Sequence, residues 1–181
     1  AVSIGLGGAA GTFTLTDATA DQITASTLEI GTSTSGAIAI DDFSPANFTT
    51  LVLRTDEGVS QGTVDAGIDL TIANLAIDSD TGVDIDVDVS TLAINNADAA
   101  SNIQIDSNSA SLTIGNVTTS TGAIQGITTN GSATIAGATA LTVENAITAD
   151  GTVSLSAVNG VTLSSTNGDV TTNGGTFTVD A

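Results

Sequence analysis

Five aspartates between residues 78 and 88 are the side chains with the clearest capacity for chemistry. The pattern Asp-x-Asp-x-Gly at the start of this stretch places two carboxylates and a flexible turn within reach of one cation. Three more aspartates follow at alternate positions, where a strand would hold them on one face and their charges would repel unless countered. Because calcium prefers oxygen ligands, the stretch predicts a calcium site formed by Asp78, Asp80, Asp84, Asp86 and Asp88.

A solvated acidic face is the competing interpretation of the same five residues. The stretch departs from an EF-hand loop, because no third acidic or amide ligand precedes Gly82 and no Glu stands at the twelfth position. The nonapeptide pattern of calcium-binding β-rolls is also absent. Calcium is therefore the one cofactor that the sequence leaves open, and no other cofactor-binding residue is predicted.

Paired carboxylates at Asp41 and Asp42 raise a second kind of chemistry, since some polysaccharide-active β-helix enzymes use two carboxylates as acid and base. The partners for such chemistry are scarce. The chain has no histidine and a single basic residue to hold an acidic sugar or take a proton. The sequence therefore predicts no catalytic residues, and we expect this pair in a loop near Phe43.

Net charge limits the partners of the chain. Twenty acidic residues stand against one basic residue, Arg54, which gives a formal charge of −19. Nucleic acid is excluded as a direct partner because nothing here can neutralise phosphates, and binding to anionic membranes is disfavoured for the same reason. Membrane insertion is not expected either, since no apolar run approaches the roughly 18 residues of a spanning helix. We expect Arg54 to pair locally with Asp56 or Glu57.

Short strands are the elements that must position these side chains. Residues 82 to 89 alternate aliphatic residues with aspartates, so a strand there would have one apolar face and one acidic face. Asn-Gly and Asp-Gly pairs, such as those at residues 130, 150, 159 and 167, mark tight turns between strands. Helix signals are weak, because Thr, Val, Ile, Ser, Gly and Asn dominate the sequence.

A Leu-x-Ile phrase, or a close variant, returns about every 21 residues in the chain. Its instances begin at Leu51, Leu70, Leu92, Leu112, Ala133, Val153 and Phe177. Weaker copies at half that spacing indicate at least two strands in each repeat. This recurrence predicts an all-β chain coiled as a parallel β-helix, a solenoid of about eight to nine rungs of about 21 residues. A β-sandwich or two tandem immunoglobulin-like domains also fit many short strands, but the core lacks a Trp or Tyr anchor.

Several of these phrases resemble repeats of large bacterial exoproteins similar to filamentous haemagglutinin. The resemblance rests on residues 51–61, 70–77, 89–96, 103–105 and 110–117. It implies a right-handed parallel β-helix on a secreted or surface-displayed bacterial protein that serves adhesion or matrix building. It implies no catalytic residues.

Together these features predict one β-solenoid segment over residues 1–181, either part of a longer chain or a subunit of an end-to-end polymer. We expect a non-enzymatic structural protein of a bacterial fibre, adhesin or extracellular filament, located outside the cell or on its surface. Its expected partners are other copies, end to end or along the fibre, and a cell-surface or matrix ligand. The alternatives are a calcium-dependent extracellular interaction module of tandem immunoglobulin-like or β-roll type, and a polysaccharide-active β-helix enzyme.

Overall fold

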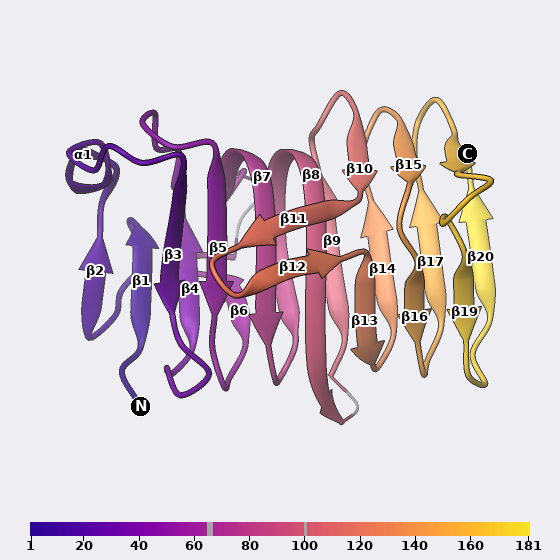
Figure 1. The fold of residues 1–181 in the computed structure, drawn as a ribbon, viewed down its shortest axis with the longest axis horizontal. Coiled ribbons are helices and arrows are strands. Elements are labelled where there is room, and N and C mark those ends of the chain that lie inside the picture. The colour runs from indigo at the N-terminus through magenta and orange to yellow at the C-terminus, as the bar shows by residue number, and fades with distance from the viewer. Residues whose placement is uncertain (65–66, 100) are drawn as a thin grey trace.

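Parallel β-strands stacked side by side make up most of the molecule (Figure 1). The computed structural model describes residues 1–64, 67–99 and 101–181. Strands account for 53% of residues and helix for 2%, so the prediction of an all-β chain is confirmed. The mostly parallel pairing is compatible with a β-helix.

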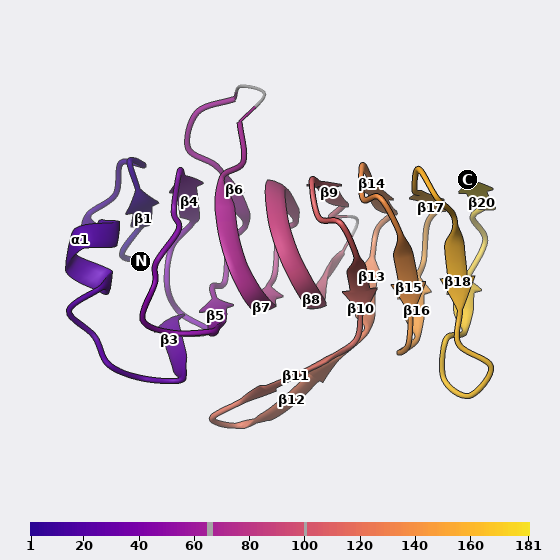
Figure 2. The same ribbon diagram turned by 90° about the horizontal axis from the view of Figure 1, so that it is seen from above.

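The parallel strands form three ladders that follow the long axis of the molecule (Figures 1 and 2). Ladder 1 stacks, in order, β2 (Phe13–Leu15), β1 (Ile4–Gly7), β4 (Ile38–Asp41), β6 (Val59–Gln61), the start of β8 (Val83–Ala99), β9 (Ile103–Ser107), β14 (Ala133–Ala136), β17 (Val153–Ser156) and β20 (Phe177–Asp180). Ladder 2 stacks Phe43, the start of β7 (Leu70–Ser79), the middle of β8, β10 (Leu112–Ile114), β15 (Leu141–Val143) and β18 (Val161–Leu163). Ladder 3 stacks β3 (Thr27–Gly31), β5 (Thr50–Arg54), the end of β7, a later part of β8, β13 (Ile127–Asn130), β16 (Ile147–Ala149) and β19 (Val170–Thr172).

Three further elements lie outside these ladders. The helix α1 (Asp17–Ala20) follows β2, and β11 (Asn116–Thr119) pairs with β12 (Gly122–Gln125) as an antiparallel hairpin. No described helix is long and apolar enough to cross a membrane.

The core lies between the ladders because successive side chains of a strand point to opposite faces. In ladder 1, Val59, Val83 and Ile103 are register partners and are all buried. Their neighbours Ser60 and Asp84 are partners in the same register and are exposed. The apolar positions of each strand therefore stack into continuous buried columns, and the polar positions form the outer surface.

The phrases that begin at Ala133, Val153 and Phe177 stack on one another in ladder 1, as the recurrence predicts, but the earlier phrases do not. Register partners from β1 to β20 in ladder 1 are 20 to 24 residues apart at five of the seven steps, but Ile4 and Ile38 are 34 apart and Ile103 and Ala133 are 30 apart. The phrase that begins at Leu51, however, lies in ladder 3 and pairs with Leu75, whereas the phrase at residue 70 lies in ladder 2. Turns of variable length explain this difference, because they shift a similar phrase from one ladder to another.

Buried polar side chains bind the backbone where ladder 3 ends. Thr55, Ser79, Asn96 and Thr129 are all buried. The Asn96 amide oxygen accepts the backbone N–H of Gly82 (3.0 Å), and its amide nitrogen donates to the Thr129 hydroxyl (3.1 Å). Among the described residues, no buried side-chain nitrogen or oxygen atom lacks a hydrogen-bond partner. These corners therefore satisfy polar groups whose burial unpaired would cost about 1–3 kcal/mol each.

Candidate functional site

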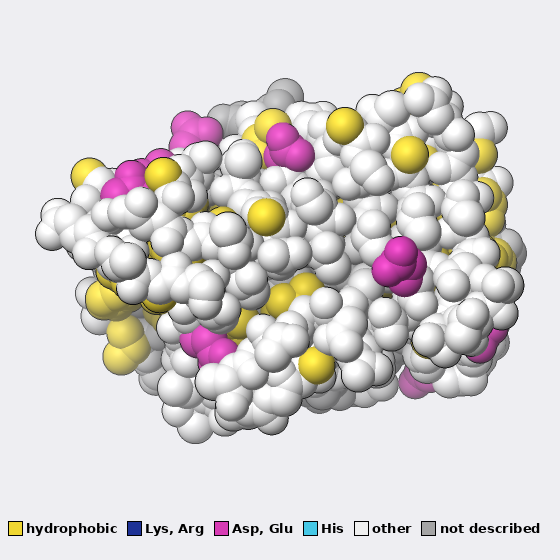
Figure 3. Space-filling view, turned by 45° about the horizontal axis from the view of Figure 1, so that its top comes forward, with side chains coloured by type: hydrophobic (Ala, Val, Ile, Leu, Met, Phe, Trp, Pro, Cys, Tyr) yellow, Lys and Arg dark blue, Asp and Glu magenta, His cyan; other side chains and the backbone are white. Residues whose placement is uncertain are grey.

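The five aspartates predicted to bind calcium lie on different parts of the molecule. Asp78 is on ladder 3, Asp84 and Asp86 are on ladder 1, Asp88 is on ladder 2, and Asp80 lies in the turn after β7. Within the described part of the chain, no three acidic side chains form a group that could hold a metal ion. Acidic side chains are scattered over the face shown in Figure 3. Calcium binding by these residues stays a prediction.

Asp78 serves a different purpose, because it pairs with the only basic side chain. Arg54 Nη1 donates to Asp78 Oδ2 at 2.6 Å, and Asn95 Nδ2 donates to Asp78 Oδ1 at 2.8 Å. Arg54, Asp78 and Asn95 are register partners on adjacent strands of ladder 3, which places their outward side chains side by side. The expectation that Arg54 pairs with Asp56 or Glu57 was therefore wrong, because stacking brings a residue 24 positions away closer than these sequence neighbours.

The β11–β12 hairpin crosses the outer surface of ladder 3 (Figures 1 and 2). Two glycines frame it: Gly115 N donates to Leu92 O at 3.0 Å, and Gly126 N donates to Gly115 O at 2.7 Å. Gly126 has φ +63°, and an added Cβ would lie 2.0 Å from the carbonyl oxygen of Ala146. Only glycine tolerates both conditions, so the hairpin can leave and rejoin the ladders at one point.

Apolar side chains hold the hairpin against the sheet. Val52, Ala76 and Ala93 are register partners on the outer face of ladder 3 and are 0% exposed. Val117 of the hairpin is buried against them, and Ile124 packs there partly buried. Such outward positions would face water without the hairpin, so the second apolar cluster exists because the hairpin covers it.

Polar contacts fasten the hairpin tip. Arg54 Nη2 donates to the hydroxyls of Thr119 (3.0 Å) and Thr121 (2.9 Å). The carboxylate of Glu29 on β3 accepts the backbone N–H of Ser120 and its hydroxyl, the latter at 2.7 Å. Burial raises the pKa of Glu29, but the two hydrogen bonds from Ser120 and the charge of Arg54 outweigh burial and leave this pKa below its usual value.

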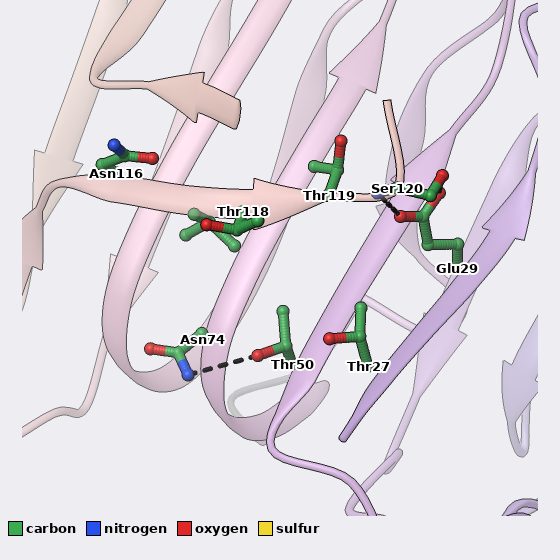
Figure 4. A pocket seen from close by; sticks show the side chains of 9 residues that line it. Thr27, Glu29, Thr50, Asn74, Asn116, Thr118, Thr119 and Ser120 are labelled. Carbon is green, nitrogen blue, oxygen red and sulfur yellow. Dashed lines mark hydrogen bonds between the residues drawn. The ribbon is translucent and has the colours of Figure 1, made fainter. Parts of the chain in front are cut away.

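Open clefts border the hairpin on both sides. The larger, of about 680 Å³, is lined by Thr27, Thr50 and Asn74 on three neighbouring strands and by residues 116–120 of the hairpin (Figure 4). Asn74 Nδ2 donates to Thr50 Oγ1 at 3.3 Å within it. A second cleft of about 330 Å³ contains Arg54 and Asp78. The larger cleft offers hydroxyl and amide groups for hydrogen bonding, with one carboxylate already engaged by Ser120.

Asp41 is the last residue of β4 and Asp42 follows it next to buried Phe43, so only Asp42 lies in the loop that was expected for the pair. Thr63 Oγ1 donates to Asp41 Oδ2 at 3.2 Å. Asp42 has φ +52°, a left-handed conformation that Asp tolerates better than most residues at tight turns. The contacts of Asp41 and the backbone of Asp42 thus describe a turn.

Sequence reasoning missed the hairpin and its cleft, although a signal was present. From β15 to β16 the chain passes from ladder 2 to ladder 3 between Val143 and Ile147, whereas the equivalent passage from Ile114 to Ile127 is much longer. This surplus of residues, bounded by Gly115 and Gly126, identifies an insertion. The irregular spacing of the phrases concealed it.

The fold and the site together define an all-β protein of mostly parallel strands, with an inserted hairpin fastened over one face. No protein-family model, curated protein or solved structure matches the chain.

Proposed function

We propose that this chain is a non-enzymatic structural segment of a bacterial fibre, adhesin or extracellular filament, coiled as a right-handed parallel β-helix of about eight to nine rungs. In this role the coil acts as a stiff spacer outside the cell or on its surface. The observation that carries the proposal is the stacking of ladder 1, where strands remain in parallel register from β2 to β20. The resemblance of the sequence phrases to exoprotein repeats points to the same role.

Composition and surface chemistry also support a structural role. The buried columns consist almost entirely of aliphatic residues, so most of each repeat serves packing. The single basic residue leaves trypsin-like proteases one target, and Arg54 is only 18% exposed under the hairpin. A chain with this property suits exposure outside a cell.

A distance measurement between two strands tests the stiff coil. Thr14 and Ser154 occupy equivalent outward positions of β2 and β17, joined by seven successive register pairs. At about 4.8 Å for each step, spin labels on Thr14→Cys and Ser154→Cys should give a narrow distribution centred near about 34 Å, widened by the label arms. The chain has no native cysteine, so the labels are specific. A broad distribution, or one far from this value, would overturn the proposed coil.

The effect of calcium on the melting temperature distinguishes the structural role from the alternative of a calcium-dependent interaction module. We expect the melting temperature to respond to calcium chloride no more than to sodium chloride of equal ionic strength. A marked fall in the melting temperature on adding a chelator, absent from a variant with Asp84, Asp86 and Asp88 changed to Asn, would favour the calcium-dependent module instead.

A further inference from the structure

The two outermost strands of ladder 1 have nearly the same sequence. Residues 11–15, which contain β2, read Gly-Thr-Phe-Thr-Leu, and residues 175–179, which lead into β20, read Gly-Thr-Phe-Thr-Val. Two of the four phenylalanines of the chain, Phe13 and Phe177, occupy the same place in these segments. Strands at opposite ends of one ladder therefore present matching side chains.

Both strands have a free edge in the described structure. β2 pairs only with β1, and β20 pairs only with β17. Phe13 is 47% exposed and Phe177 is 39% exposed, although both continue the column that holds the buried residues Ile103, Ala133 and Val153. Unpaired strand edges with exposed apolar side chains are templates for pairing with another chain.

The register of ladder 1 defines how a second copy would fit. Ile4 pairs with Phe13 at one end of the ladder, and Val153 pairs with Phe177 at the other. A second copy placed head to tail keeps every strand parallel. It would set Phe177 of one copy on Phe13 of the next, with Thr178 on Thr14 and Val179 on Leu15. In-register pairing of matching segments stacks identical side chains, which favours such contacts.

An open apolar cleft beside β2 completes the contact surface. It has a volume of about 400 Å³ and is lined largely by aliphatic side chains and Phe13, including Val2, Leu15, Leu28 and Ile30. At the opposite end Leu163 and Val179 are exposed at 43% and 46%. Each end therefore exposes apolar surface that the other can cover.

Ladders 2 and 3 do not continue across this contact, because ladder 3 ends one strand short of ladder 1 at each end and the first position of ladder 2 is covered. The outermost strands of ladder 3 are β3 and β19, each paired on one edge among the described residues. At ladder 2 the segment around α1 covers the first position: Asp17 Oδ1 accepts the backbone N–H of Ser44 at 3.1 Å, and Asp21 Oδ1 accepts that of Ala46 at 2.7 Å. Pairing of β20 with β2 therefore makes ladder 1 alone continuous, and β19 and the next β3 stay apart by two strand positions.

We propose that copies of this chain associate head to tail through parallel pairing of β20 with β2 of the next copy, with Phe177 stacked on Phe13. This inference rests on the proposed structural role and gives its self-association a defined surface and direction. The interface is heterologous, so it extends into a filament unless the rotation closes it into a ring. Like charges on the copies oppose it, so added salt strengthens it by screening.

Disulfide trapping tests the register. Thr14 and Thr178 are exposed, and in the proposed pair their Cα atoms would lie about 4.8 Å apart, within the range that a disulfide spans. A mixture of Thr14→Cys and Thr178→Cys chains should form a disulfide-linked dimer under mild oxidation. The matched control replaces Thr14→Cys by Thr16→Cys, two residues further along the chain. The Cα atom of residue 16 would lie about 8 Å from that of Thr178 in the neighbouring copy, beyond the reach of a disulfide.

Complementary blocking variants test the direction. By sedimentation velocity, Phe13→Asp and Phe177→Asp should each be monomeric alone, because each lacks one of the two matching edges. Their mixture should form dimers and nothing larger, since each copy retains the edge that the other has lost. Val64→Asp adds the same charge at a 90% exposed position outside the ladders and should assemble as the unmodified chain does.

Three results would overturn the head-to-tail inference: monomers of the unmodified chain at high salt, equal trapping with the displaced cysteine, or dimers of either blocking variant alone. The spin-label distance within one chain separates this failure from failure of the proposed function. A narrow distance near the expected value with no association would leave the structural role intact and remove only the interface.

Discussion

Replacing Arg54 with alanine tests whether the hairpin is fastened as the structure indicates. The change removes a 2.6 Å ion pair with Asp78 and two hydrogen bonds to hydroxyls of the hairpin tip. The apolar contacts of Val117 and the bonds between Ser120 and Glu29 remain. The hairpin should therefore open more often while the ladders stay folded.

The expected size of the effect follows from the contacts that join hairpin and sheet. Two hydrogen bonds from the Arg54 guanidinium reach the hairpin, and bonds to a charged group contribute about 1.5–3 kcal/mol each when well shielded. Arg54 is partly exposed, at 18%, so solvent screening reduces the sum. We expect the free energy of hairpin opening to fall by about 2 kcal/mol. Where the opening equilibrium sets the rate of amide exchange, hairpin amides should then exchange roughly 30-fold faster.

Amide hydrogen exchange by nuclear magnetic resonance is the suitable assay, because it reports local opening separately from global unfolding. Exchange should accelerate at hydrogen-bonded amides of β11 and β12 and remain unchanged in β14. Thr148→Ala is the matched control, since Thr148 lies in the same outward column two strands beyond Asn95. Unchanged hairpin exchange in Arg54→Ala, or equal acceleration in β14, would refute the assignment of Arg54 as the fastening residue.

Three further predictions concern the hairpin and the corners. The pKa of Glu29 is lowered in the folded chain, so its ionised form stabilises hairpin docking above the usual glutamate pKa of about 4.3. This stabilisation is lost as pH falls through the lowered pKa. Amide exchange in the hairpin, corrected for intrinsic rates, should show the loss, and the Glu29→Gln variant should not. Gly126→Ala should lower the melting temperature more than Gly122→Ala, because both glycines have positive φ but only Gly126 is crowded by backbone; equal losses would contradict the close approach. Asn96→Ala should reduce the free energy of unfolding by about 2–3 kcal/mol in urea titrations, because it leaves the partly buried backbone N–H of Gly82 unpaired. Asn95→Ala should reduce it clearly less, since the carboxylate of Asp78 that loses a hydrogen bond is solvent-accessible. The reverse order would contradict the role given to Asn96.

Local alternation predicted the strands well. The aliphatic residues of the 82–89 stretch are buried along β8, and the intervening Asp84 is exposed, as a period of two requires. The repeat of about 21 residues also appears at five of the seven steps from β1 to β20 in ladder 1. These features were readable because they depend on neighbours within a strand or on turns between consecutive strands.

The recurrence predicted the cross-strand neighbours of the phrases at Ala133, Val153 and Phe177, but it did not predict those of the earlier strands. Leu51 pairs with Leu75 instead of the phrase at residue 70, and Arg54 meets Asp78 instead of Asp56. A strand partner depends on the summed length of all turns between two strands. An inserted hairpin or a longer corner changes that sum without changing the alternation within either strand.

The amino-acid sequence by itself determined an acidic, all-β chain of short strands with buried aliphatic columns, because alternation and turn residues act over a few positions. Only the tertiary structure decided that the aspartates from Asp78 to Asp88 disperse over three ladders, because a chain that turns corners points consecutive acidic side chains in different directions. It also decided that β11 and β12 cover Val52, Ala76 and Ala93. Finally, it placed two matching Gly-Thr-Phe-Thr segments, 164 residues apart at their phenylalanines, at opposite free edges of one ladder, because stacking converts distance along the sequence into distance along an axis.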